Sequence, residues 1–170
     1  RRFEAPRVAG GRVLAVDDEG SAYLAWLDVL EQRLTLYKVD ATGQLVNQWP
    51  VLDGMFAAAD DVKIGADGVV YVSARAGTIL KAYSNEGYLL WAQEYPVPVV
   101  SGDMFLYQWQ VSTLHVLADG NLLMANIDTL RLLSPGGVEL HAITASDQGV
   151  DRFTRVTVSD ERVWVVAVDA

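Results

Sequence analysis

Residues 67–95 read DGVVYVSARAGTILKAYSNEGYLLWAQEY. This stretch holds apolar runs rich in Val, Leu and Tyr, which are too short for stable helices and are typical of β-strands. Gly68 and Gly87 each follow an acidic residue between two such runs. Glycine reaches positive φ without steric cost, so both positions signal tight hairpins. The stretch therefore predicts strands that are joined by hairpins.

The first of these hairpins recurs along the chain. Its four copies are marked by Gly20, Gly68, Gly120 and Glu161, which are spaced by 48, 52 and 41 residues. This spacing is typical of four-stranded propeller blades. In the first three copies, apolar residues lie four and six positions before the marker, so one face of the strand is apolar. In the fourth and weakest copy, Thr157 and Arg155 take those two places.

A second hairpin recurs three times, at 34–49, 78–91 and 129–141. Each blade therefore has strands a, b, c and d, with tight turns between a and b and between c and d. We predict an all-β fold: a β-propeller of four-stranded antiparallel blades, about three and a half of them, in one segment over residues 1–170. The expected blades are 11–51, 60–97, 112–143 and a partial blade at 154–170.

Two known bacterial repeats resemble these segments. Residues 67–95 resemble the tryptophan-docked repeat of the PQQ-like quinoprotein family, whose relatives include non-catalytic propeller lipoproteins of outer-membrane assembly. Residues 16–49 are equally similar to the secreted β-propeller repeat with the patterns D-x-x-G-x-x-Y and K-x-D-x-x-G. The resemblance implies a propeller fold, docking of Trp49 and Trp91 between blades, and an extracytoplasmic location, periplasmic or secreted.

Composition excludes several kinds of partner and site. The net charge of −9 disfavours nucleic acids and anionic membranes as partners, because approach would cost electrostatic work, and leaves cationic partners open. The chain has no cysteine, which excludes disulfides, thiolate metal sites and cysteine nucleophiles. No apolar run is long enough for a membrane helix, so we expect no membrane insertion. We expect no cofactor.

The connections between strands divide into two rims. Turns a–b and c–d lie on one rim, and connections b–c and d–a lie on the other. The d–a connection between Trp91 and Asp119 is longer than its counterparts and contains GDMFLYQWQ at 102–110. Its side chains could form a recognition patch for a protein partner, as aromatic anchors do at interfaces, or could cover a neighbouring blade. The candidates are Met104, Phe105, Tyr107 and Trp109.

Lys63 and His115 are candidates for the central channel. They occupy the same repeat position, five before the marker glycine, where Ala15 and Val156 stand in the other copies. Strand a is innermost in a propeller, so the two side chains could form an acid/base or anion-binding pair. The alternative is a solvated channel wall or a structural pair. The acidic run that begins at Asp17 favours a solvated turn over a calcium loop, and we expect no metal site.

We expect a non-enzymatic binding or scaffold module that presents one rim to a protein partner. About three and a half blades do not close a ring, so we expect the chain to belong to a larger propeller or to an oligomer that completes the ring. The alternative is a fragment of a propeller enzyme, either a quinoprotein-like dehydrogenase or a hydrolase, lyase or transferase with a channel-lining site. The absence of a cysteine pair and the presence of only two histidines disfavour this alternative.

Overall fold

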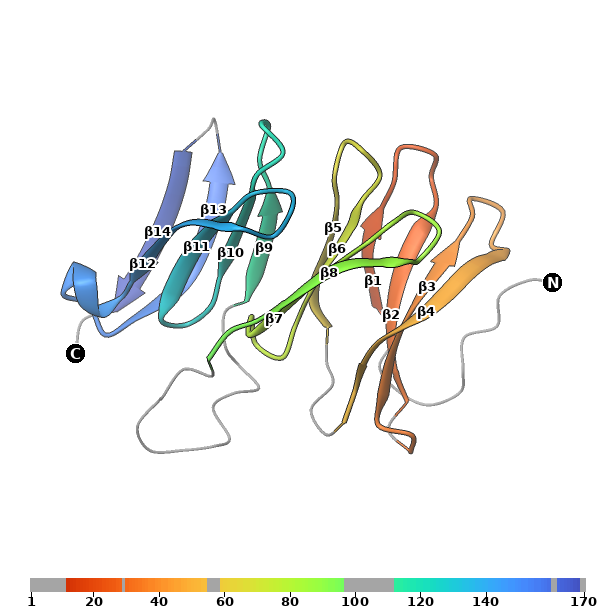
Figure 1. Ribbon diagram of the computed structural model, residues 1–170, viewed down its shortest axis with the longest axis horizontal. Helices are drawn as coiled ribbons and strands as arrows, with labels where there is room; N and C mark the ends of the chain where they lie inside the picture. Colours follow the sequence, from red (N-terminus) through yellow and green to blue (C-terminus); the bar gives the residue numbers. More distant parts are fainter. Residues whose placement is uncertain (1–11, 29, 55–58, 97–111, 160–161, 169–170) are drawn as a thin grey trace.

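Four antiparallel sheets follow one another along the chain (Figure 1). The structure is a computed structural model that describes residues 12–28, 30–54, 59–96, 112–159 and 162–168. Blade one contains β1 (Arg12–Val16), β2 (Ala22–Asp28), β3 (Arg33–Val39) and β4 (Leu45–Asp53). Blade two contains β5 (Ala59–Ile64), β6 (Val70–Ala74), β7 (Ile79–Tyr83) and β8 (Leu89–Glu94). Blade three contains β9 (Thr113–Val116), β10 (Leu122–Ala125), β11 (Thr129–Leu133) and β12 (Glu139–Thr144).

The fourth sheet is a hairpin. It contains β13 (Arg152–Ser159) and β14 (Arg162–Val168), and a single 3-10 turn, η2 (Ser146–Gln148), precedes it. Within each blade the strands pair in chain order, and the first strands of the first three blades contact one another, β1 with β5 and β5 with β9. The predicted fold class, a propeller of four-stranded antiparallel blades with about three and a half of them, is confirmed. No helix of the described segments is long and apolar enough to cross a membrane.

Six glycine turns share one geometry. In each, the glycine has φ between 78° and 88° and its N–H donates to the carbonyl three residues earlier at 2.9 Å. Such φ values are strained for any residue with a Cβ, so glycine is required. The turn chemistry that the sequence predicts is therefore present at Gly20, Gly43, Gly68, Gly87, Gly120 and Gly137. We call the edge formed by these turns the glycine rim and the opposite edge the variable rim.

Apolar side chains fill the space between neighbouring blades. Blades one and two share a buried cluster that includes Leu36 and Val62, and blades two and three share one that includes Leu80 and Leu114. A third cluster joins blade three to β13 through Phe153. The strands of blades two and three can bury both faces in this way because each of these blades has a neighbour on each side. Apolar side chains that are buried between neighbouring sheets therefore hold the blades side by side.

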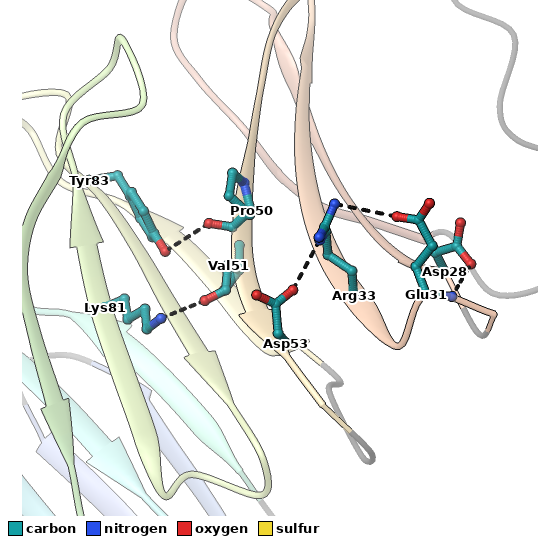
Figure 2. A network of polar contacts seen from close by, with 8 residues as sticks. All are labelled: Asp28, Glu31, Arg33, Pro50, Val51, Asp53, Lys81 and Tyr83. Atoms are coloured by element: carbon teal, nitrogen blue, oxygen red, sulfur yellow. Dashed lines mark hydrogen bonds and ion pairs between the residues drawn. The ribbon is translucent and has the colours of Figure 1, made fainter.

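Polar contacts also join blades one and two (Figure 2). From β7, the Lys81 ammonium donates to the Val51 carbonyl at 2.6 Å and the Tyr83 hydroxyl donates to the Pro50 carbonyl at 3.4 Å. Burial raises the pKa of Tyr83 to about 12, so the hydroxyl keeps its proton. Nearby, Arg33 forms ion pairs with Asp53 and Glu31, but all three side chains are exposed and such pairs contribute little stability.

The two tryptophans dock on the next blade, as the resemblance implies. A Cβ added to Gly87 would lie 2.8 Å from the Trp49 ring, and one added to Gly137 would lie 2.9 Å from the Trp91 ring. The Trp91 indole N–H also donates to the Pro135 carbonyl at 3.0 Å. Each ring thus occupies the space that only a glycine leaves free.

Asp17 corrects one prediction from the sequence. We expected a solvated turn, but the Asp17 carboxylate is largely buried and pairs with the Lys38 ammonium at 3.2 Å. The Tyr23 hydroxyl donates to the same carboxylate at 3.3 Å and to Asn85 of blade two at 3.1 Å. Asp17 follows β1, and its carboxylate reaches Tyr23 on β2 and Lys38 on β3, which lie opposite each other in the ladder. The acid is therefore part of a buried polar network between blades.

The fourth hairpin corrects another prediction. The ladder of β13 and β14 ends at the pair Ser159 and Arg162, whereas the other a–b ladders end at pairs separated by five positions, as Ile64 and Val70 are. Val156 is buried in the third core cluster and Val158 packs against it, as Val62 and Ile64 do in the first cluster, so Val158 takes the place of Ile64. The alignment on Glu161 was wrong by one residue, because it assumed turns of equal length.

Candidate functional site

Hydrogen bonds between neighbouring segments hold the loops of the variable rim. The Gly77 N–H donates to the Asp60 carboxylate at 2.9 Å, and the Phe153 N–H donates to the Ile127 carbonyl at 2.8 Å. A Cβ on Gly77 would lie 3.0 Å from that of Asn126, whose side chain is buried and caps its own loop. On the variable rim, the described loops of blade two and blade three are therefore in contact, and the loop of blade three is hydrogen-bonded to β13.

The predicted aromatic patch lies outside the described residues. Met104, Phe105, Tyr107 and Trp109 belong to the segment 97–111, between β8 and β9 in the sequence. They remain a prediction.

The channel candidates lie on neighbouring inner strands. Lys63 is on β5 and His115 is on β9. The Lys63 ammonium pairs with the Asp61 carboxylate at 3.0 Å, and the other oxygen of this carboxylate accepts the Leu114 N–H at 3.3 Å. Asp61 therefore holds Lys63 in place and ties β5 to β9.

His115 is neutral at neutral pH. Burial lowers its pKa most, and the positive charge of Lys63 lowers it further, whereas Asp61 and a backbone hydrogen bond with Val156 act in the opposite direction. Its Nε2 atom is buried without a hydrogen-bond partner among the described residues, and so is the Thr113 hydroxyl, two positions earlier on the strand. Buried polar atoms without partners are uncommon and call for an explanation. A neutral imidazole with a free ring nitrogen can accept a hydrogen bond or a proton.

Sequence reasoning missed Asp61 as a member of this group. The signal was present, because Asp61 lies two positions before Lys63 and so shares its face of the strand. The corrected register adds Arg155 and Thr157, which take the positions of Asp61 and Lys63 in blade four and are exposed. Within the described residues, no group of three acidic or histidine side chains is arranged to hold a metal ion.

The free edge of β14 exposes a continuous run of apolar side chains. All seven residues of the strand are exposed, including Trp164 at 56% and Val166 at 55%. The strand pairs with β13, and its other edge has no partner among the described residues. By contrast, β6 and β10 hold the same position in their blades, are flanked on both edges and are buried along their whole length. Unpaired apolar edges recruit further strands.

Comparisons with known proteins concern the fold alone. No protein-family model matches the chain, and no curated protein is similar to it in sequence. Solved structures are similar in fold, among them the following three. A protein of unknown function from Bacteroides caccae has a TM-score of 0.61 and 16% identity, over 93% of this chain and 56% of that one. Virginiamycin B lyase from Staphylococcus aureus has a TM-score of 0.65 and 12% identity, over 94% of this chain and 52% of that one.

The third structure, puromycin hydrolase, has a TM-score of 0.55 and 18% identity, over 94% of this chain and 25% of that one. The chain thus spans about half of the first two structures and a quarter of the third. At these identities the likeness extends to architecture and not to activity. The chain has a β-propeller fold, which is shared by proteins described as a lyase, a hydrolase and a protein of unknown function.

Proposed function

We propose that this chain is a non-enzymatic binding module that forms part of a larger propeller, and that it binds the remaining blades through β14. The exposed, unpaired edge of β14 carries the proposal. In blades one to three, the strand beside strand b is strand c, which runs antiparallel to it, as β7 does beside β6. The partner expected for β14 is therefore a strand of the same kind, from the blades that follow.

Burial of this strand would supply a large driving force. Five large apolar side chains of β14 are 40–56% exposed. Covering each would contribute on the order of 1 kcal/mol, or about 5 kcal/mol together, before the cost of ordering the partner. The likeness to longer propellers, of which the chain spans about half in two cases, also supports further blades as the source of the strand.

A peptide that imitates the missing strands tests the proposal. The peptide TLRLLSPGGVELHAIT repeats residues 129–144, the c–d hairpin of blade three. We expect the fluorescently labelled peptide to bind the chain and to slow hydrogen exchange in β14. Val166→Lys should weaken binding, because a charge on an edge blocks strand pairing. Leu30→Lys, at a side chain that is 88% exposed on the variable rim, is the matched control.

Two results would overturn the proposal. One is a peptide that fails to bind, or that binds both lysine variants equally. The other is a stable dimer in light scattering that Val166→Lys dissociates, since the occupant of β14 would then be a second copy.

We also propose a protein-binding role for the aromatic patch on the variable rim, in an extracytoplasmic location that only the repeat resemblance supports. Replacement of Phe105, Tyr107 and Trp109 by Ser should leave the thermal unfolding midpoint unchanged if the rings face a partner. A large fall in the midpoint would instead assign them to a local core.

A propeller enzyme with a channel site is the second candidate. The observation that favours it is the free, buried Nε2 of His115 beside Lys63. A panel of quinones, calcium and substrates of lyases and hydrolases, measured by thermal shift, tests this candidate. A stabilising compound whose effect is lost in His115→Gln would replace the scaffold proposal with an enzymatic one.

A further inference from the structure

Exposed apolar side chains recur at the same place in three blades. They lie just after the glycine of each c–d turn, at the start of the outermost strand, and their exposure ranges from 41% to 73%. We call this set the outer belt: Leu45, Val46, Tyr88, Leu89, Leu90, Val138 and Leu140. Monomeric proteins seldom expose apolar side chains in such a repeated array without a partner.

The outer belt is more than the outward face of an amphipathic strand. Leu90 lies at a β-bulge of β8, because Tyr83 pairs with Leu89 and Ala82 pairs with Trp91, and Leu89 and Leu90 are both more than half exposed. Val46 lies at the equivalent bulge of β4 and Leu140 at that of β12, and both are also more than half exposed. A bulge leaves its extra residue unpaired and interrupts the alternation of the two faces, so adjacent side chains at the beginnings of the outer strands are available to a partner together.

Contacts between blades join the three parts of the belt. The Asn47 amide donates to the Glu86 carbonyl at 2.6 Å, and the Gln93 amide donates to the Gly137 carbonyl at 3.3 Å. In both cases, strand d of one blade contacts the c–d turn of the next blade. The part of the belt on that next blade begins at this turn. The tryptophan rings dock beside the same contacts. The belt therefore runs across three blades on a backbone that is held at each junction.

The neighbouring surface is acidic. The six turns of the glycine rim, at 17–21, 40–44, 65–69, 84–88, 117–121 and 134–138, contain no Lys or Arg and seven Asp or Glu residues, of which all but the buried Asp17 contribute to the surface. A hydrogen bond from the backbone of Gln44 lowers the pKa of Asp40, and a hydrogen bond with the Ser84 side chain lowers that of Glu86. Both carboxylates are ionised at neutral pH and lie within a few residues of the belt.

We propose that the outer belt, with the acidic turns beside it, docks a basic amphipathic segment of another protein. Apolar side chains of the segment would cover the belt, and its Lys or Arg side chains would face the glycine rim. A second copy of this chain fits poorly, because it would bring two acidic rims together. An anionic membrane is repelled for the same reason. This surface is separate from β14 and from the variable rim.

Three short peptides test the proposal with the folded chain. One alternates leucine and lysine, the second alternates leucine and glutamate, and the third alternates serine and lysine. We expect only the leucine–lysine peptide to bind in fluorescence anisotropy, with an affinity that falls as salt rises. The double variant Tyr88→Ser and Leu90→Ser should weaken binding at least tenfold, and Glu86→Gln should reduce the salt dependence. Leu30→Ser, on the opposite rim, should have no effect.

Several results would overturn the proposal. Equal binding of the serine–lysine peptide would show attraction by charge alone, and equal binding of the leucine–glutamate peptide would show non-specific apolar adhesion. The same loss of affinity in Leu30→Ser would place the site elsewhere. Capture of the chain by phosphatidylcholine vesicles through Tyr88 and Leu90, without peptide binding, would make the belt a membrane surface. Because these side chains are exposed, the thermal unfolding midpoint should stay within a few degrees in every variant.

Discussion

Two glycines with the same backbone conformation but different surroundings allow a direct test of tryptophan docking. Gly43 has φ of 82° and no atom within 4 Å of an added Cβ, whereas Gly87 has φ of 88° and a Cβ there would lie 2.8 Å from the Trp49 ring. We predict that Gly87→Ala destabilises the chain clearly more than Gly43→Ala does. The pair separates the cost of the conformation from the cost of the lost space.

The magnitudes follow from the two contributions. An alanine at either position must adopt a left-handed conformation, which costs about 1–2 kcal/mol. At Gly87 the methyl group must also displace the indole of Trp49, which is only 5% exposed and packs against Tyr23 and Tyr83. Overpacking of this kind costs a further ~1–3 kcal/mol. The difference between the two variants should therefore be about 1–3 kcal/mol.

Urea unfolding of both variants, followed by tryptophan fluorescence, measures this difference. Gly87→Ala should also change the fluorescence of the folded state, because the Trp49 ring moves, whereas Gly43→Ala should leave it unchanged. Equal free energies of unfolding in the two variants would refute the docking argument, since the backbone cost alone would then account for both.

Three further predictions concern buried charges. Hydrogen bonds from the Ser21 N–H and from Lys38 lower the pKa of Asp17 although burial opposes them, so urea unfolding should show stability falling as pH drops through the lowered pKa, below the ordinary value of 3.8. Asp17→Asn should cost about 2 kcal/mol at neutral pH, because Lys38 loses its charged hydrogen-bond partner. The variant should also lack that part of the pH dependence, and an unchanged profile would contradict the pairing. Lys63→Met should raise the pKa of His115 in an NMR titration, since it removes a nearby positive charge, and no change would mean that the two groups do not interact.

The sequence predicts the blades well because the turn chemistry is local. A glycine after an acidic or small residue determines the hairpin without reference to the rest of the fold. The fourth hairpin was misaligned for a related reason. Its turn uses no glycine, so aligning Glu161 with Gly68 assumed a turn length that the chain does not have. In the alignment on Glu161, the polar residues Arg155 and Thr157 take positions that are apolar in the other three copies. When the register is shifted by one residue, Val156 and Val158 take those positions instead.

The candidate site was less predictable because it depends on packing between blades. The repeat places Lys63 and His115 at equivalent positions, but equivalence within a repeat does not tell which neighbour a side chain faces. The contact of Asp61 with the Leu114 backbone crosses from one blade to the next. Likewise, Asp17 lies in an acidic turn that any local rule assigns to solvent, and only the position of Lys38 on β3 draws it into the sheet.

The glycine rim and the variable rim differ because the c–d turns perform two tasks. Gly87 and Gly137 supply the positive φ of a turn and also leave room for the tryptophan of the preceding blade. An insertion in such a turn would move the glycine away from the ring, so its length is restricted. Exposed turn residues such as Glu86 and Asp119 are free to change in charge, which explains how this rim can be acidic and still regular. In the part of the variable rim that the structure describes, no tryptophan docks on a connecting glycine, so the lengths of those connections are less restricted. The glycine rim can therefore change its charge without changing its backbone, whereas the variable rim can change the length of its connections.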